Sequence, residues 1–444
     1  MSLWHMAWSY LWNRKLTTSL TILSVALAVG LITSVLTLRE ETKRRFEEEG
    51  QAFDMVIGAK GSPLQLVLSS VYLMDQPTGN ISRDLYRELK ADEEYVEAAY
   101  PINMGDSYRG FRLVGTTRDL FNHTWESLIS GEVREPFTLA DGRYFDQPFE
   151  AVVGALAARQ TGLKVGDTFR STHGLIELPE SMGGHTHPEQ YEVVGILEPS
   201  SSPYDRAIFC DLKSVWQAHA HGHHKHGHGE DAHQETESGH SEKAHAADTA
   251  PEHEYREWGK NPEEMITAVL VQLQSPLMRF QYKAKIRETT NAMAAIPINE
   301  IRKLYDQLLG TAKLVLLTVG YLVVVISALS ILIGLYLSII QRKRDLAIMR
   351  ALGASKYEVF GAVLIEAFWV TVLGIACGWL LGNLVAYGLG LYLARNFGLA
   401  IQPFTTSQEQ LAAFATVAVV GILAGILPAW QAYRSDIARD LAAQ

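Results

Sequence analysis

Long apolar runs with almost no charge are the feature that most constrains this chain of 444 residues. The first run extends from Leu16 to Leu38 and contains 23 residues without a formal charge. At about 1.5 Å per helical residue, such a run covers the roughly 30 Å of a bilayer's hydrocarbon core. No small-x-small cleavage site follows it, so we expect an uncleaved anchor rather than a signal peptide. The chain is therefore predicted to cross a membrane.

Three further apolar windows lie at Leu314–Ile340, Val359–Tyr392 and Leu411–Trp430. Short loops between membrane helices carry excess Lys and Arg on the cytoplasmic side. Here the cations gather between the second and third windows and after the fourth, at Arg342, Lys343, Arg344, Arg350, Lys356, Arg434 and Arg439. We therefore expect both termini in the cytoplasm.

The resulting fold class is a membrane protein of four transmembrane helices with a large mixed α/β extracytoplasmic domain inserted between helices 1 and 2. The expected boundaries are 1–15 for a cytoplasmic or interfacial amphipathic helix, 16–38, 311–340, 359–392 and 411–432 for the transmembrane helices, 39–310 for the extracytoplasmic domain, 341–358 for a cytoplasmic helix, 393–410 for an external loop and 433–444 for a cytoplasmic tail.

The inserted domain is acidic, with 28 Lys and Arg against 43 Asp and Glu in residues 39–310. Binding nucleic acid requires clustered cations, so we exclude that class of partner. Short apolar runs at Ala151–Val153, Tyr191–Val194 and Ala268–Gln272 predict strands of a mixed α/β domain. We also expect one long helix from Arg279 to Tyr305 that leads into the second membrane helix.

Glycines recur at every fourth position in the last two apolar windows, at Gly374, Gly378, Gly382, Gly421 and Gly425. Small residues at this spacing allow helices to approach closely in lipid, so we interpret them as packing positions. The windows lack a row of ionisable side chains, which argues against an ion channel or a proton-coupled carrier.

The basic segment between the second and third windows has a helical stop and restart. Gly353 suits the left-handed residue that ends a helix, and Ser355 with Glu358 predicts a capping box that begins the next. Before Gly353, residues 348–352 supply an apolar side that could dock into a partner groove. The alternative is a loop at the membrane surface whose cations face lipid headgroups.

Residues 341–355 resemble the coupling helix of permease subunits in the MacB/FtsX/LolCDE (type VII) ABC systems. Shorter matches at Asn13–Thr17, Glu150–Gly154, Gly162–Asp167 and Tyr191–Leu197 extend the resemblance over the whole chain. Asp345 stands where that family usually has Glu. The resemblance implies that these residues contact an ATPase: Arg344, Asp345, Ile348, Met349, Arg350, Ala351, Gly353 and Ala354.

The resemblance also implies a non-catalytic subunit in the inner (plasma) membrane of a bacterial cell. The sequence contains no Gly-x-x-x-x-Gly-Lys-Ser/Thr motif, so we expect ATP and Mg²⁺ on a separate ABC ATPase subunit. Such permeases work as dimers, which predicts a homodimer with two ATPase chains and a periplasmic or lipoprotein partner. The work done would be mechanotransmission, export, or the handling of lipoproteins or peptides. An alternative is an FtsX-like regulator of an extracytoplasmic enzyme.

Histidines are concentrated in one polar tract, with ten of the 15 between His219 and His253. Its composition cannot bury a core, so we expect residues 218–257 to form a flexible loop. Imidazole binds zinc, copper and nickel well, and zinc is the candidate metal. The predicted metal ligands are His185, His187, His219, His221, His223, His224, His226 and His228. Two alternatives stay open: a zinc-acquisition or zinc-homeostasis component, or a solubilising tract that binds metal weakly.

Overall fold

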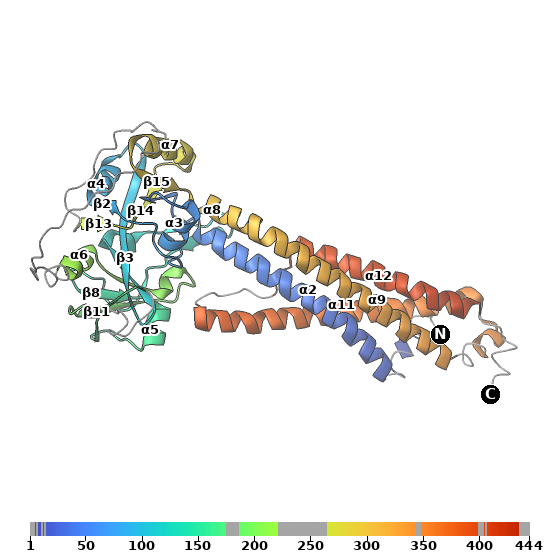
Figure 1. The fold of residues 1–444 in the computed structure, drawn as a ribbon. Helices are drawn as coiled ribbons and strands as arrows, with labels where there is room; N and C mark the ends of the chain where they lie inside the picture. Colours follow the sequence, from blue (N-terminus) through green and yellow to red (C-terminus); the bar gives the residue numbers. More distant parts are fainter. Residues whose placement is uncertain are drawn as a thin grey trace, which may run out of the picture. The chain divides into compact units, whose positions relative to one another are not determined.

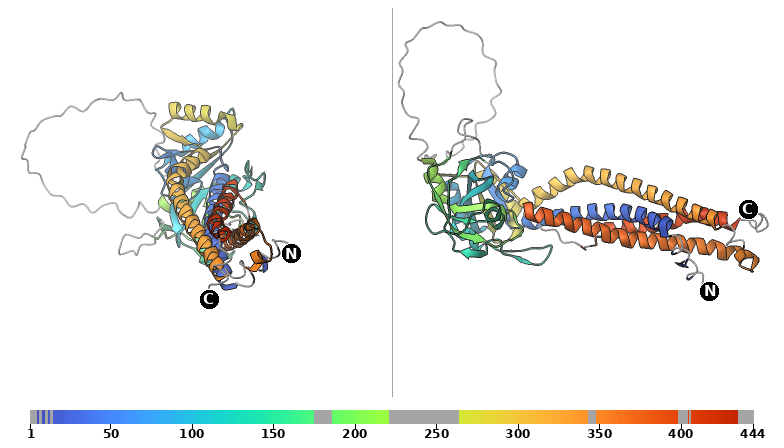
Figure 2. Two further views of the ribbon diagram at one scale, coloured as in Figure 1. Left: turned by 90° about the vertical axis from the view of Figure 1, so that its right-hand side faces the viewer. Right: turned by 90° about the horizontal axis from the view of Figure 1, so that it is seen from below.

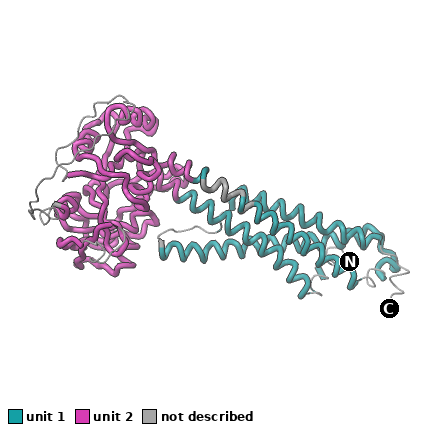
Figure 3. Tube along the Cα trace, in the orientation of Figure 1, with its two compact units in different colours: residues 1–45, 305–444 teal, residues 46–304 magenta. Residues whose placement is uncertain are grey.

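The computed structural model describes residues 5, 8–9, 12, 15–174, 186–220, 264–342, 348–397, 404 and 406–434. The chain divides into two compact units, shown in different colours in Figure 3. Unit 1 comprises residues 1–45 and 305–444, and unit 2 comprises residues 46–304. Each unit is described by itself below.

Unit 1 is built from long apolar helices. They are α2 (Lys15–Glu49), whose last residues belong to unit 2, α9 (Gly310–Gln341), preceded by a π-helical turn at Tyr305–Leu309, α11 (Lys356–Phe397) and α12 (Gln408–Tyr433). Within the described residues, these four helices are long and apolar enough to cross a membrane. They run side by side in Figures 1 and 2, around a buried cluster that includes Val25, Ile331, Ala367 and Val417. The chain is thus a multi-pass membrane protein.

The N-terminal segment, predicted to be an amphipathic helix over residues 1–15, lies largely outside the described residues. Of its aromatic residues, Trp8 and Trp12 are described, and the Trp8 ring meets that of Trp369 in α11 edge-on, with centroids 5.0 Å apart. Both side chains belong to unit 1.

A glycine face of α11 lies directly against α2. A Cβ atom added at Gly378 would stand 2.6 Å from the Val29 Cβ and 2.8 Å from the backbone oxygen of Ala26. Corresponding Cβ atoms at Gly374 and Gly382 would each approach α2 to within 2.5–2.6 Å, and those at Gly421 and Gly425 of α12 would approach Thr371 and Ala367 of α11 as closely. At these five positions there is room for a hydrogen atom and no more, as close helix packing in lipid requires.

Unit 2 is an α/β unit around a mixed sheet. Its strands are β1 (Met55–Ala59), β2 (Ile81–Ser82), β3 (Val96–Tyr108), β4 (Phe111–Thr116), β5 (Trp125–Glu126), β6 (Val133–Arg134), β7 (Leu139–Gly142), β8 (Glu150–Val153), β9 (Thr168–Phe169), β10 (Thr172–His173), β11 (Tyr191–Leu197), β12 (Ala207–Asp211), β13 (Met265–Ile266), β14 (Ala268–Leu273) and β15 (Ala292–Ala295). Its helices are α3 (Pro63–Ser70), α4 (Arg83–Ala91), α5 (Ala155–Thr161), α6 (Leu212–Ala220), α7 (Arg279–Thr289) and α8 (Pro297–Leu304), with short 3₁₀ turns at Arg118–Asn122, Pro203–Arg206 and Pro276–Met278.

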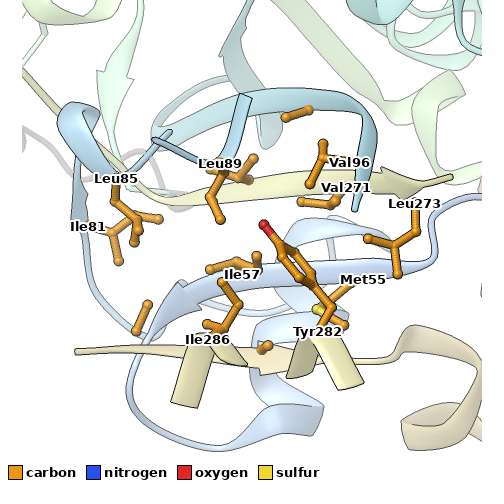
Figure 4. Packing of buried hydrophobic residues seen from close by; sticks show 14 of the residues in the cluster. Met55, Ile57, Ile81, Leu85, Leu89, Val96, Val271, Leu273, Tyr282 and Ile286 are labelled. Atoms are coloured by element: carbon orange, nitrogen blue, oxygen red, sulfur yellow. The ribbon is translucent and has the colours of Figure 1, made fainter. Parts of the chain in front are cut away.

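The main sheet has the strand order β15-β1-β14-β3-β4-β12-β8-β11-β7, with β10 paired to β3 and β9 paired to β11. The β4–β12 and β8–β11 pairs are parallel, and the other pairs are antiparallel. One buried cluster packs around β1 and β14: in Figure 4, Tyr282 and Ile286 of α7 lie over Met55 and Ile57 of β1. Because β3 is the longest strand and crosses the middle of this sheet, side chains from both halves of unit 2 can meet along it.

The structure confirms three strands that the apolar runs predicted, namely β8, β11 and β14. The long helix predicted from Arg279 to Tyr305 is wrong. That segment forms α7, then β15 on the edge of the sheet, then α8. Pro297 has no N–H and cannot continue a helix, and the apolar run before it pairs with β1.

The predicted start of the flexible loop at residue 218 is also wrong, because α6 extends through Ala220. His219 therefore lies on a helix. The remainder of that prediction, from residue 221 onward, lies outside the described residues.

Gly378→Ala tests the close approach of α2 and α11. The added methyl group would meet Val29 and the backbone of α2, and overpacking of this kind costs about 1–3 kcal/mol. We expect a lower melting temperature for the purified protein in detergent. The matched control is Gly388→Ala in the same helix, where a Cβ meets nothing within 4 Å. A stability loss of equal size in both variants would contradict the packing role.

Candidate metal centre and coupling segment

Four side chains of unit 2 converge at one point: Asp106, His173, His187 and His219. Asp106 lies on β3, and His173 lies opposite it on β10 in the antiparallel register. Directly opposed residues of such a pair project to the same face of the sheet. The pairing of β3 with β4 is irregular between Met104 and Ser107, and a bulge of this kind re-aims a side chain. Strand pairing therefore brings the carboxylate to the first imidazole.

His187 and His219 reach the same carboxylate from other segments. An isolated bridge between Thr172 and Thr186, and a bond from the His187 backbone N–H to the Ser171 carbonyl (2.9 Å), hold residue 187 beside β10. His219 is presented by the last turn of α6. Four chain segments, namely β3, β10, the segment of residue 187 and α6, are thus needed to assemble the group.

The distances within the group are short. His173 Nδ1 lies 3.0 Å from Asp106 Oδ1, while His219 Nε2 lies 3.4 Å from Oδ1 and His187 Nε2 lies 3.4 Å from Oδ2. The centroids of the three imidazole rings are 4.6–5.1 Å apart. The Asp106 side chain is 1% exposed, so these imidazoles, rather than water, surround it.

The electrostatics favour an ionised carboxylate. Burial by itself would raise the pKa of Asp106, but the neighbouring imidazoles of His173, His187 and His219 lower that pKa well below its ordinary value. In return, the bond to Asp106 raises the pKa of His173, although partial burial acts in the opposite direction. The group therefore presents a charged oxygen at neutral pH, which is the form that binds a cation.

One carboxylate and three imidazoles are a donor set that first-row transition ions bind. One potential ligand atom from each of the four residues lies within 4.8 Å of the others. With four protein donors, no position is left open for a water molecule to attack a substrate. The arrangement thus fits a binding centre rather than a hydrolytic one.

Two of the predicted metal ligands, His187 and His219, belong to this group. The other six, His185, His221, His223, His224, His226 and His228, lie outside the described residues. Sequence reasoning missed Asp106 and His173 as ligands, although His173 stood near the predicted His185 and His187. Asp106 gave no signal, because only the pairing of β3 with β10 reveals that it meets His173.

The segment between α9 and α11 has the turn that the sequence predicted. Residues 348–351 are helical, and Gly353 follows with φ +105°, a value that a side chain disfavours. Ser355 and Glu358 form the capping box: the Ser355 N–H donates to Glu358 Oε2 (2.7 Å) and the Glu358 N–H donates to Ser355 Oγ (3.2 Å). Both local predictions are confirmed. Arg344 and Asp345 lie outside the described residues.

The apolar side chains of this segment divide into two groups. Met349 packs inward against a buried cluster that includes Ile339, Val359 and Ala429, so it supports the segment. Ile348 and Leu352 are exposed to 41% and 84%. The face that remains available for docking is therefore smaller than the whole apolar side predicted from the sequence.

Just before this segment, a charged pair is buried in unit 1. Arg342, which the sequence suggested as a loop cation, bonds to Glu366 of α11, and the two side chains are 7% and 8% exposed. Ser338 of α9 donates a further hydrogen bond to Glu366 Oε1 (3.2 Å). These bonds tie the C-terminal end of α9 to α11.

Comparison with known proteins identifies the family. Residues 18–287 match the MacB-like periplasmic core domain and residues 317–437 match the FtsX-like permease C-terminal domain. The chain therefore belongs to the MacB/FtsX-type family of ABC transporter permeases. Its four apolar helices and α/β unit agree with that assignment.

Curated relatives include proteins named "Macrolide export ATP-binding/permease protein MacB". That of Nitrosomonas europaea is 23% identical over 443 residues, covering 97% of this chain and 57% of the relative. That of Shewanella oneidensis is 29% identical over 158 residues, covering 36% and 23%, and that of Escherichia coli K12 is 32% identical over 136 residues, covering 31% and 20%. The matches thus span between a fifth and just over half of the relatives' length.

The buried pair at the end of α9 gives a prediction about stability. Glu366→Leu leaves the Arg342 guanidinium buried without its carboxylate, which costs about 3–5 kcal/mol. We expect a large fall in melting temperature in detergent. Replacing both charges, as Arg342→Met with Glu366→Leu, should recover most of that loss. A double variant no more stable than Glu366→Leu alone would show that the pair is not the cause.

Proposed function

We propose that this chain is the transmembrane subunit of an ABC transporter and couples ATP hydrolysis on a separate ATPase to conformational work in unit 2. The observation that carries the proposal is the continuity of α2, which extends from Lys15 in unit 1 to Glu49 in unit 2 without a break. A helix is stiff along its axis, so displacement at one end of α2 reaches the other end.

The last turn of α2 is held firmly within unit 2. The ring of Phe46 stacks on Tyr72, with centroids 5.2 Å apart, and the Tyr72 hydroxyl donates to the Phe46 carbonyl. Arg134 forms an ion pair with Glu49 at 3.2 Å, between side chains that are 16% and 5% exposed. Motion of α2 would therefore pull on unit 2 rather than bend an unattached helix end.

The proposed topology follows the distribution of cations. It puts both termini and the 341–358 segment in the cytoplasm, and the 39–310 domain outside the inner membrane, inserted between the first and second membrane helices. Residues 16–38, 311–340, 359–392 and 411–432 would cross the bilayer. In this arrangement the coupling segment and unit 2 lie on opposite sides of the membrane.

The proposed ATPase contact is the exposed part of the coupling segment. Ile348 and Leu352 offer apolar side chains, Arg350 supplies a cation, and the Gly353 turn sets the direction in which they point. ATP and Mg²⁺ would be bound by the ATPase. The assembly would contain two copies of this chain and two ATPase chains, with a periplasmic or lipoprotein partner on unit 2.

Gly353→Val tests the coupling role. Valine is strained at φ +105°, by roughly 1–3 kcal/mol, so the turn should shift and weaken ATPase association roughly 5- to 100-fold. Co-purification with the ATPase and the rate of ATP hydrolysis by the complex are the measurements, with Arg350→Glu as a second variant. Gly361→Ala, where a Cβ meets nothing within 4 Å, is the control. An unchanged complex in both coupling variants would contradict the proposal.

The histidine–aspartate group favours a second function, that of a zinc-handling component. If metal occupancy regulates the transporter, zinc should change the ATPase rate of the reconstituted complex, and Asp106→Asn should abolish that response. Deletion of residues 222–245, which leaves His219 in place, separates the centre from the histidine tract. Zinc-independent hydrolysis in the unmodified complex would reject this second function and leave the first intact.

A further inference from the structure

The group formed by Asp106, His173, His187 and His219 contains two buried polar atoms that the described residues do not satisfy. Neither Asp106 Oδ2 nor His187 Nε2 makes a hydrogen bond of acceptable geometry with a described residue, although the two atoms are 3.4 Å apart. Their side chains are 1% and 8% exposed. Leaving a buried donor or acceptor unpaired costs about 1–3 kcal/mol, and more when the group is charged. A cation between these atoms would satisfy both.

The spacing of the donors fits a small four-coordinate ion. In a tetrahedral zinc site with bonds of about 2.0–2.1 Å, the ligand atoms lie roughly 3.4 Å from one another. Here His173 Nδ1 and His219 Nε2 lie 3.0 and 3.4 Å from Asp106 Oδ1, His187 Nε2 lies 3.4 Å from Oδ2, and one potential ligand atom from each residue lies within 4.8 Å of the others. Small side-chain shifts would therefore close the site around an ion.

The donor types narrow the class of metal. Calcium and magnesium prefer six or more oxygen ligands, whereas this group offers three imidazole nitrogens and one carboxylate. Copper(I) prefers the sulfur of cysteine or methionine, and the four-residue group has none. These donors best suit a divalent ion of intermediate hardness that has no strong geometric preference of its own.

We propose that Asp106, His173, His187 and His219 bind one zinc(II) ion in a closed, four-coordinate site. The ion would join β3, β10, residue 187 and the last turn of α6, and so would fasten four segments of unit 2 together. Because the donors fill all four positions, the site is non-catalytic. This site does not depend on the coupling function, because it is defined by contacts within unit 2.

The site differs from the histidine tract in a way that can be measured. We expect the histidine tract, with many imidazoles on a polar chain, to bind several ions weakly. The four donors of the proposed site are already assembled by a sheet and a helix, so we expect them to bind one ion tightly. His219 precedes the tract in the sequence and belongs to the four-residue site. Deleting residues 222–245 therefore removes seven of the ten histidines between His219 and His253 and keeps the four proposed ligands.

The test uses the full chain purified in detergent, with residues 222–245 deleted and metal removed by a chelator. We expect this protein to bind one zinc ion per chain in competition with a chromophoric chelator, and zinc to raise its melting temperature. Asp106→Asn in the same background should weaken binding by at least about 100-fold, because losing a ligand costs more than losing an outer-shell partner. Asp119→Asn, which changes an exposed aspartate outside the group, should bind zinc normally.

Cobalt(II) reports the geometry, since four-coordinate cobalt absorbs visible light far more strongly than six-coordinate cobalt. We expect intense bands in the tract-deleted protein and their loss in His219→Gln, a change at a partly exposed ligand that the fold should tolerate even if Asp106→Asn does not fold. Stoichiometric binding that persists in both ligand variants would overturn the proposal. So would weak cobalt bands, or the absence of tight zinc binding once the tract is removed.

Discussion

Close packing between α2 and the glycine face of α11 is the interaction on which the rest of this molecule depends. Without a hydrophobic driving force between helices in lipid, association rests on van der Waals contact, which falls off quickly with distance. A Cβ atom added at Gly374, Gly378 or Gly382 would lie within 2.5–2.6 Å of atoms of α2. That contact packs the membrane part of α2, a helix that continues into unit 2, against α11. Any transmission of movement along α2 would therefore start from this packing.

Much of the architecture could be predicted from the sequence because it depends on local patterns. Apolar runs as long as Leu16–Leu38 have few alternatives to crossing a membrane, and runs such as Ala268–Gln272, between turn residues, favoured strands. The failure at Arg279–Tyr305 has a local cause as well. Polar, helix-favouring residues at its start hid the short apolar run before Pro297, which pairs with β1. The local sequence does not show that residues 292–295 have a strand, β1, to pair with.

Only half of the candidate metal centre could be predicted from the sequence, for a physical reason. Composition drew attention to His187 and His219, but the carboxylate that unites them is 67 residues before His173 in the chain. Only the register of β3 with β10, the irregularity near Asp106 and the position of α6 bring these side chains together. Ligands that only the tertiary structure brings together have no characteristic spacing in the sequence. The same applies to Arg342, whose partner Glu366 lies one helix away.

In the proposed mechanism, ATP hydrolysis by a partner ATPase moves the coupling segment, and α2 passes the resulting movement to unit 2. Hydrogen exchange of the chain reconstituted in nanodiscs with its ATPase tests that claim most directly. Trapping the ATPase with ATP and vanadate should change exchange in the last turn of α2 and around Tyr72, and Gly353→Val should remove that change. Exchange that responds to nucleotide in the ATPase alone, with unit 2 unaffected, would contradict the account.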